Sequence, residues 1–476
     1  MFPKDFIFST STAAYQVEGA WNESGKGVSI WDDIVHRDPS FIADRSNGDT
    51  AADSFHLYKE DVQLVKHLGF RMYRFSISWP RVLPDGSTKF INEPGVKYYE
   101  DLIDELLAND IAPMVTIYHW DLPQMLQQKG GWLNSTIVDD FEKYADFVFS
   151  RFASKVKWWI TINEPFSITT GYGGDDYAPG LTMHGIGDYL AGHNLLKAHA
   201  RAYRLYKSKY SKFEGKLSLS LDANGAYPKD ETNEEDIRAA NRFMEFELGW
   251  FAHPVFSRYG NYPAVLRDRV DLNSAREGRD DSRLPYFTKD EIEEIRGTYD
   301  FFALNHYSSR LCTSGKTGPT PSWSRDSNVV TSFNDSWPPS QSSWLKVAPE
   351  GFRKVLNWIK TNYDNPEVFV TENGFSDYNQ LHDLGRIDYL KGYLSELSKA
   401  INEDGCNVIG YTVWSILDNF EWRAGYTERF GLVHVDFNSP NRTRTMKQSA
   451  TFIKKFIKEN SFDSNENEIQ VMYKTW

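Results

Sequence analysis

Cysteine is almost absent from this chain of 476 residues, which contains only Cys312 and Cys406. Two isolated cysteines support neither a disulfide framework nor a thiolate metal site. No Gly-x-Gly-x-x-Gly turn follows the first predicted strand, so the sequence offers no dinucleotide site. We therefore expect neither a metal ion nor a cofactor.

Long hydrophobic runs are also lacking, and none approaches the length that spans a membrane. Residues 1–6 do not show the basic start and apolar stretch of a signal peptide. The chain is therefore cytosolic or begins after a removed signal. Four sequons, at Asn22, Asn134, Asn334 and Asn441, mildly favour secretion.

Basic side chains are outnumbered, with 53 against 66 acidic ones and a formal net charge of −13. An acidic surface gains nothing from DNA phosphates or anionic lipids, so we expect no nucleic-acid partner and no membrane partner. A small neutral ligand fits better. The hydrophobic content of 40% is typical of a globular protein with a sizeable core. The sequence leaves a homodimer open.

Short apolar runs of strand type alternate with helical patterns along the chain. Helical patterns cover, for example, residues 95–107 and 141–152. The strand-like runs number eight, at residues 6–11, 71–78, 112–118, 156–162, 216–221, 300–305, 367–371 and 407–414. Eight strands alternating with helices predict an α/β fold with a closed (βα)8 TIM barrel rather than an open doubly wound sheet.

A minimal barrel needs about 250 residues, so the excess must lie in long βα loops. The longest irregular stretch is 310–343, which is rich in Ser, Thr, Pro and Gly, and others span 32–49 and 169–187. No linker and no shift of composition marks a second domain. We predict that residues 1–476 form a single barrel domain.

Two short segments place a glutamate where a predicted buried strand gives way to a loop. They are TINEP at 161–165, which contains Glu164, and TENG at 371–374, which contains Glu372. Parallel barrel strands end at one rim, so these glutamates can face each other although about two hundred residues separate them. Two carboxyl groups facing across a pocket are the minimum machinery for cleaving a glycosidic bond.

Polar or aromatic side chains follow nearly every predicted strand at its carboxyl end. They are Gln16, Arg74, His119 with Trp120, Asn163 with Glu164, Asn305 with Tyr307, Glu372 and Trp414. Only the fifth strand, which ends near Asp222 and Asn224, gives no clear assignment. A purely structural barrel has no reason to gather such side chains on one rim, so we predict a functional site there.

The chain resembles glycoside hydrolase family 1, and most nearly its animal, insect-type β-glucosidases. The resemblance covers nearly the whole chain. It rests on segments in a fixed order: FIFSTSTAAYQVEG at 6–19, YRFSISW at 73–79, YHWDLP at 118–123, NEP at 163–165, ENG at 372–374 and NFEW at 419–422. Each segment alone is a modest signal, whereas the ordered series is highly specific.

The resemblance implies retaining hydrolysis of terminal nonreducing β-D-glucosyl residues, with galactosyl or fucosyl residues also open. Glu372 would be the nucleophile that forms a covalent glycosyl-enzyme. Glu164 would protonate the leaving group and then activate water, with the two carboxyl groups about 5–5.5 Å apart. Arg74 would favour the charged form of Glu372, while that charge and partial burial would keep Glu164 protonated.

The resemblance also assigns supporting residues. Tyr307 would donate a hydrogen bond to Glu372, Asn163 would hold the sugar 2-hydroxyl, and Asn305 would be a further supporting residue of the catalytic site. The remaining sugar hydroxyls would be bound by Gln16, His119, Trp120, Glu421 and Trp422. The ring face would pack on Trp414, and the aglycone would pack on Trp344.

Alternative functions stay open at this stage. A β-thioglucosidase (myrosinase) acting on glucosinolates is one, because Thr170 and Arg310 lie in loops that could reach a charged aglycone. Glu164 favours O-glycosides, because some plant thioglucosidases carry glutamine there. A phospho-glycosidase is disfavoured by Glu421, which would repel a phosphate. A catalytically silent sugar-binding relative is disfavoured by the presence of both Glu164 and Glu372.

Two further patterns imitate functional motifs. A second Asn-Glu-Pro, at residues 92–94, precedes a helical pattern, so we expect Asn92 or Glu93 to cap a helix. The stretch from His193 to His199 has only a faint metal-ligand spacing and lies on an apolar helical pattern. We expect its histidines to belong to the core.

Overall fold

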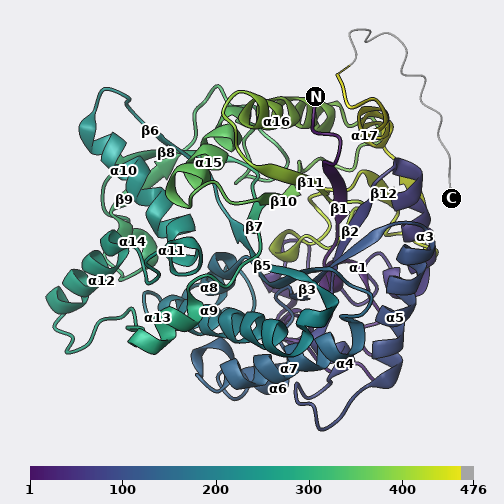
Figure 1. Cartoon of the computed structure of the whole chain (residues 1–476), viewed down its shortest axis with the longest axis horizontal. Coiled ribbons are helices and arrows are strands. Elements are labelled where there is room, and N and C mark those ends of the chain that lie inside the picture. Colours follow the sequence, from purple (N-terminus) through teal and green to yellow (C-terminus); the bar gives the residue numbers. More distant parts are fainter. Residues whose placement is uncertain (463–476) are drawn as a thin grey trace.

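The computed structural model describes residues 1–462, and eight parallel strands close into a barrel at its centre (Figure 1). The strands are β1 (Ile7–Ser11), β2 (Met72–Ser76), β3 (Ala112–Tyr118), β4 (Trp158–Asn163), β5 (Lys216–Asp222), β7 (Phe302–Asn305), β10 (Val368–Asn373) and β11 (Val408–Trp414). Around the barrel they follow the order β1-β11-β10-β7-β5-β4-β3-β2, and β1 pairs with both β11 and β2. The predicted TIM barrel is confirmed, and each observed strand end lies within two residues of its prediction.

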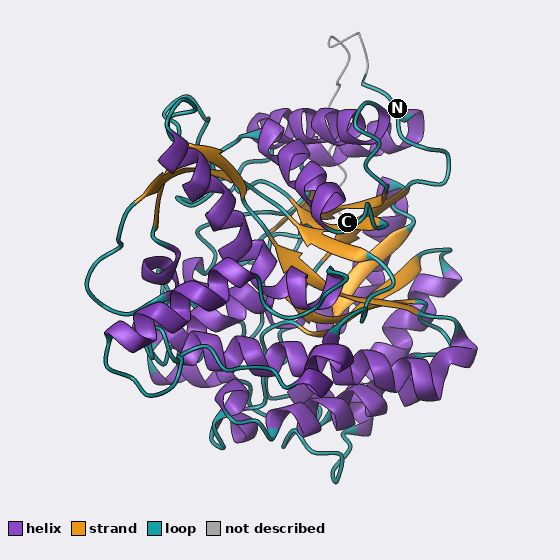
Figure 2. Ribbon diagram, turned by 60° about the vertical axis from the view of Figure 1, so that its left-hand side comes forward, coloured by secondary structure: helices purple, strands orange, loops and turns teal. Residues whose placement is uncertain are grey.

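Helices cover the outside of the barrel (Figure 2). Its strands are buried on both faces, because side chains also fill the inside. This double burial explains why the strands read as continuous apolar runs. One apolar cluster comes from the first halves of the strands and closes that end of the barrel: Met72, Met114, Ile160, Phe301, Ala303 and Phe369. The opposite, carboxyl-terminal end is left for polar side chains.

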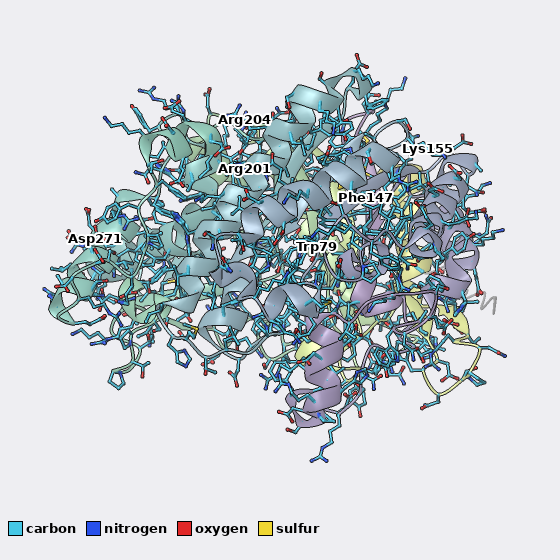
Figure 3. All side chains as sticks on the ribbon, turned by 90° about the horizontal axis from the view of Figure 1, so that it is seen from below. Trp79, Phe147, Lys155, Arg201, Arg204 and Asp271 are labelled. Carbon is cyan, nitrogen blue, oxygen red and sulfur yellow. The ribbon has the colours of Figure 1, made fainter. Side chains whose placement is uncertain are left out.

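The outer layer consists of amphipathic helices. Its main members are α3 (Ser54–Leu68), α5 (Glu93–Ala108), α7 (Ile137–Phe152), α9 (Gly187–Leu205), α13 (Lys289–Ile295), α15 (Pro349–Asn362), α16 (Leu384–Asn402) and α17 (Gln448–Glu459). Helices α5 and α7 confirm the two predicted helical patterns. Figure 3 shows Arg201 on the outer surface, where it pairs with Glu142 of α7 at 2.9 Å and Glu294 of α13 at 3.1 Å. In residues 1–462 no helix is both long and apolar enough to cross a membrane.

Smaller elements fill the connections. The helices are α1 (Ala14–Val17), α2 (Ile30–Arg37), α4 (Trp79–Val82), α6 (Gln124–Gln127), α8 (Pro165–Gly173), α10 (Glu234–Met244), α11 (Trp250–Phe256), α12 (Ala264–Arg276) and α14 (Trp323–Ser327), with the single turns η1 (Pro39–Phe41), η2 (Gly131–Leu133), η3 (Tyr206–Tyr210), η4 (Ser211–Phe213), η5 (Glu245–Gly249) and η6 (Trp422–Ala424). Outside the barrel, β6 (Gly225–Pro228), β8 (Ser309–Ser314) and β9 (Val329–Ser332) form one sheet, and β12 (Val433–Val435) pairs with β13 (Arg444–Met446).

The three stretches predicted to be irregular are only partly so. Residues 310–343 contain most of β8 and all of α14 and β9, because β8 pairs with β6 on one side and β9 on the other. Residues 32–49 begin inside α2, which a capping box between Ser29 and Asp32 starts. Residues 169–187 begin inside α8.

The two imitating patterns prove to be structural. Helix α5 begins at Glu93, as expected, but the side chain of Asn92 does not cap it. Asn92 instead donates to the carbonyl oxygens of Ser24 and Arg81, at 2.7 and 2.8 Å, because the preceding loop folds over it. The two histidines of α9 that bound the stretch 193–199 are buried and hydrogen-bonded within the core, as expected.

Candidate active site

A cavity of about 760 Å³ lies at the carboxyl-terminal end of the barrel strands. Its wall includes eleven of the predicted site residues: His119, Trp120, Asn163, Glu164, Asn305, Tyr307, Trp344, Glu372, Trp414, Glu421 and Trp422. The other two, Gln16 and Arg74, are fully buried behind this wall. Such a volume is in the range of pockets that bind small molecules.

Glu372 is the next-to-last residue of β10, and both of its carboxylate oxygens accept hydrogen bonds. Oε1 accepts from Nη1 of Arg74 and Oε2 from the hydroxyl of Tyr307, each at 2.7 Å. The carbonyl oxygen of Tyr307 accepts from the hydroxyls of Tyr389 and Tyr393, at 2.7 and 2.9 Å, which fixes the segment after β7. The carboxylate is therefore held in one orientation from two sides.

Glu164 lies between β4 and α8 with a left-handed backbone (φ 48°), a conformation uncommon for residues other than glycine. Its N–H donates to the carbonyl oxygen of Ser220 on β5 at 2.8 Å, and Pro165 starts the helix. In the side chain, Oε1 accepts from Nδ2 of Asn305 at 2.8 Å, and Oε2 contacts the hydroxyl of Ser167 at 3.0 Å.

Asn305 and Arg74 connect the two glutamates. The Asn305 side chain hydrogen-bonds to Glu164 and also interacts with Glu372, and its Nδ2 lies 3.1 Å from Oδ1 of Asn163. Arg74 donates to that same Oδ1 at 2.6 Å as well as to Glu372. One amide within reach of both carboxyl groups means that the glutamates lie close together at the base of the cavity.

The two glutamates differ in their affinity for a proton. Burial raises the pKa of Glu164 well above its ordinary value, and the charges of Asp222 and Glu372 raise it further. Burial also raises the pKa of Glu372, but Arg74 and Tyr307 oppose this rise. The proton therefore lies preferentially on Glu164 rather than on Glu372. Arg74 acts in the expected direction, although burial of Glu372 acts more strongly.

His119 is the neutral tautomer with its proton on Nδ1. Oδ1 of Asn163 accepts from Arg74 and Asn305, so the Asn163 amide faces Nε2 of His119, at 3.1 Å, and donates to it. Burial lowers the pKa of His119, and the charge of Arg74 adds to this. Nδ1 has no hydrogen-bond partner among the described residues, so it can donate to a ligand in the cavity.

Gln16 and Glu421 meet at another part of the wall. Nε2 of Gln16 donates to the carbonyl oxygen of Phe420 at 2.9 Å and lies 3.4 Å from Oε2 of Glu421. Burial raises the pKa of Glu421, and the nearby charge of Glu428, another lining residue, raises it further. Two acidic side chains at this place make it unfavourable for an anion.

The predicted tryptophans occupy two levels of the cavity. Trp414, Trp120 and Trp422 are buried, and the rings of Trp120 and Trp422 lie 4.6 Å apart. Trp344 is 38% exposed, and its ring stacks beside that of Phe430 at 6.3 Å. The structure thus offers an enclosed apolar surface within the cavity and a second, open one near Trp344.

The family model for glycosyl hydrolase family 1 matches residues 1–462. This chain belongs to glycosyl hydrolase family 1.

Similar proteins include Myrosinase 1 from Brevicoryne brassicae, which is 51% identical over 458 residues, or 96% of this chain and 98% of that protein. The structure of an aphid myrosinase superposes with a TM-score of 0.93 at 50% identity and covers 96% of this chain and 99% of that one. A rice β-glucosidase mutant in a covalent complex with Glc has a TM-score of 0.88 and 40% identity, covering 95% of this chain and 98% of that one.

In this family 1 chain, the strand order around the rim brings several acidic and amide side chains into a row. Neighbouring strands β4, β5, β7 and β10 present Glu164, Asp222, Asn305 and Glu372 in that order. The other arc consists of β11, β1, β2 and β3. Strand β11 carries Trp414 and precedes Glu421, β1 precedes Gln16, β2 carries Arg74 and β3 precedes His119.

The lining residues to which the sequence prediction gave no role include Ser167, Asp222 and Glu247. Ser167 contacts both Glu164 and Asp222, at 3.0 and 3.1 Å. Glu247, from η5, accepts two hydrogen bonds from Asn224 and lies near Asp222. Asp222 could have been identified from the sequence, because it stands at the end of the fifth strand. Nothing in the sequence marks Ser167 or Glu247 as residues of the site.

Loop residues named for a charged aglycone also line this cavity. Thr170 belongs to α8, and Arg310 belongs to β8. Nη1 of Arg310 donates to the carbonyl oxygen of Ser309 at 3.0 Å, and the guanidinium lies over the ring of Phe333. In residues 1–462, no group of three or more His, Cys, Asp or Glu side chains is arranged to hold a metal ion.

Proposed function

We propose that this family 1 chain hydrolyses terminal nonreducing β-D-glucosyl residues by double displacement. The observation that carries the proposal is the pair formed by Glu164 and Glu372, which Asn305 contacts together. The pair combines a carboxyl group that favours its proton with a carboxylate held by two donors. A retaining glycosidase needs these two states side by side.

In the first step, Glu372 attacks the anomeric carbon, and a glycosyl–oxygen bond forms as the bond to the leaving group breaks. Glu164 gives its proton to the leaving oxygen, so no free alkoxide is released. In the second step, Glu164 takes a proton from water, which attacks the anomeric carbon and frees Glu372. The covalent complex of the rice relative with Glc supports an intermediate of this type.

The surrounding contacts support the proposed sugar site. Asn163, held by Arg74 and Asn305, is placed to bind the 2-hydroxyl, and His119 offers its Nδ1–H. Oε1 of Gln16 has no partner among the described residues and is suited to accept from a sugar hydroxyl. The residues proposed to complete the site are Glu421, Trp120, Trp414, Trp422 and, for the aglycone, Trp344.

Turnover of p-nitrophenyl β-glucoside tests this proposal. We expect the intact protein to release p-nitrophenol and Glu372→Gln to lose turnover of activated and unactivated β-glucosides alike. Glu164→Ala should retain the first step for the activated substrate, because its leaving group needs no proton. Added azide should then restore turnover and yield the β-glucosyl azide.

An α-azide from Glu164→Ala would reverse the two roles, because azide would then have attacked the face that Glu372 is proposed to use. Failure of the intact protein to turn over glucoside, galactoside, fucoside and cellobiose would favour a silent sugar-binding protein. Circular dichroism of each variant separates a lost carboxyl group from a lost fold.

A β-thioglucosidase is the second candidate, favoured by Arg310 and by the 51% identity to Myrosinase 1. Arg310 lines the cavity, and its guanidinium has the charge to bind a sulfate. However, Glu247 lies close enough to stabilise that charge, and Asp222 adds a second carboxyl group. A glucosinolate with kcat/KM above that of cellobiose, and its selective loss in Arg310→Gln, would favour the thioglucosidase.

A further inference from the structure

Ser167 stands between two carboxyl groups of the proposed active site. Its hydroxyl oxygen lies 3.0 Å from Oε2 of Glu164 and 3.1 Å from Oδ2 of Asp222. The three residues come from different elements, since Glu164 follows β4, Ser167 lies in the first turn of α8 and Asp222 ends β5. All three line the cavity.

A serine hydroxyl has one proton, so Ser167 can donate to only one of these carboxyl groups at a time. The other contact becomes a hydrogen bond only when that carboxyl group is protonated and donates to the serine oxygen. The trio is therefore satisfied when it holds one proton, either on Glu164 with Asp222 charged or on Asp222 with Glu164 charged.

The other contacts of the two carboxyl groups indicate which oxygen carries the proton. Oε1 of Glu164 already accepts from the Asn305 amide, so a proton on Glu164 belongs on Oε2, the oxygen beside Ser167. Oδ1 of Asp222 has no hydrogen-bond partner in the described part of the chain. After burial, the charge of Asp222 is the largest influence that raises the pKa of Glu164, ahead of the charge of Glu372.

We propose that Asp222 and Ser167 are positioning residues that balance Glu164 between acid and base: the charge of Asp222 keeps its proton in place, and the hydroxyl of Ser167 stabilises the carboxylate once the proton has left. The inference rests on the proposed function. Esterification of Glu372 removes its charge, but the charge of Asp222 remains, so Glu164 stays basic enough to take a proton from water. The proton that leaves with the aglycone in the first step is replaced from water in the second.

Other charged groups face this trio and must be included. Glu247 of η5 raises the pKa of Asp222, which burial brings to about 7, and Arg310 of β8 in turn opposes the rise for Glu247. Glu372 of β10 acts on both Asp222 and Glu164. Burial raises the pKa of Tyr177 and of Tyr307, and the charges of these carboxylates raise it further, so both tyrosines remain neutral.

The test is the pH profile of kcat/KM for an alkyl β-glucoside, whose poor leaving group needs the proton of Glu164. Asp222→Asn removes the charge that holds this proton, so the alkaline limb should move to lower pH, by about one unit. Ser167→Ala removes a hydrogen bond that favours the charged form of Glu164, so the same limb should move to higher pH. Opposite shifts are the signature, because loss of structure alone would not separate them.

Glu247→Gln is the matched control, since it removes a neighbouring buried charge without touching Ser167. Its shift of the alkaline limb should be smaller than that of Asp222→Asn. An unmoved limb in Asp222→Asn, shifts of equal sign in the Asp222 and Ser167 variants, or an equal shift in Glu247→Gln would each overturn the inference. If Asp222→Asn fails to fold, the upward shift in Ser167→Ala alone decides. Lack of turnover by the intact protein would instead overturn the proposed function.

Discussion

At the scale of single residues, the hold on Glu372 determines how the proposed nucleophile behaves. Arg74 and Tyr307 each donate to one carboxylate oxygen, and both oppose the effect of burial on its pKa. Arg74 also holds Asn163, so changing it would disturb several contacts at once. Tyr307 offers a cleaner change, because only its hydroxyl contacts Glu372.

We predict that Tyr307→Phe moves the acidic limb of kcat/KM to higher pH by about one unit, because one lost hydrogen bond to a carboxylate costs about 1.4 kcal/mol or more. Glu372 must be ionised to attack, and its raised pKa would leave less of it charged at low pH. The alkaline limb, which depends on Glu164, should stay in place. A pH profile with an alkyl β-glucoside, whose leaving group needs the proton of Glu164, measures both limbs, and an unmoved acidic limb would contradict the prediction.

The sequence predicted the site residues that follow strands, but not those that depend on contacts between elements. Glu164 and Glu372 each stand at the end of an apolar run, so their position was readable. Ser167 was not, because a serine in a first helical turn has many ordinary uses and its contact with Asp222 joins residues 55 apart. Burial of Glu372 and the acid Glu428 beside Glu421 likewise emerge only in three dimensions.

At the scale of elements, the barrel strands were predictable because both of their faces are buried. The extra sheet was not. Strand β8 reads as SRLCTS, which is too polar for an apolar run, and it exists because it pairs with β6 and β9. Its partners lie in two separate loops, so pairing rather than local preference decides its structure.

The glycine that ends the TENG segment has an element-scale function. A Cβ on Gly374 would lie 1.9 Å from the carbonyl oxygen of Trp414, so β10 and β11 can approach each other only with glycine here. We predict that Gly374→Ala lowers the free energy of unfolding by about 1–3 kcal/mol and reduces turnover, because β10 carries Glu372.

Thermal unfolding and kcat measure the two effects. Gly315→Ala is the control, because its Cβ would meet only the side chain of Val330 at 3.0 Å, which can move. Equal stability loss in both variants would mean that the approach of β10 to β11 is not decisive.

At the scale of the whole molecule, buried ionisable groups govern how stability varies with pH. Burial raises the pKa of Asp121 to about 8, with a further rise from Glu18 and an opposing effect of Lys26. The folded chain therefore keeps a proton that the unfolded chain loses near pH 4, so stability falls as pH rises through this window. Burial lowers the pKa of His199 and His306 to about 4, which makes stability rise up to about pH 6.5.

Above pH 6.5 the effect of these histidines is complete, while that of Asp121 continues. We predict that Tm falls between pH 6.5 and 8 and that Asp121→Asn reduces this fall, because asparagine has the same shape and no proton to lose. One proton corresponds to about 1.4 kcal/mol per pH unit. Differential scanning fluorimetry at several pH values measures the slope, and an unchanged slope in the variant would contradict the assignment.

Some properties of the whole molecule stay predictions. These are the single catalytic domain over residues 1–476, of which 463–476 lie outside the described part, the absence of nucleic-acid and membrane partners, and a homodimer. Small β-glycosides are the partners that membership of family 1 supports.

The order of strands around the rim separates two tasks. Under the proposed mechanism, the arc from β4 to β10 breaks the bond, whereas the side chains expected to recognise the sugar come mainly from the arc of β11, β1 and β3. Substitutions on one arc of the barrel rim can therefore change which sugars are accepted, while the catalytic residues on the other arc stay unchanged. Duplicated genes for such a protein could diverge in substrate specificity while keeping the same hydrolytic residues.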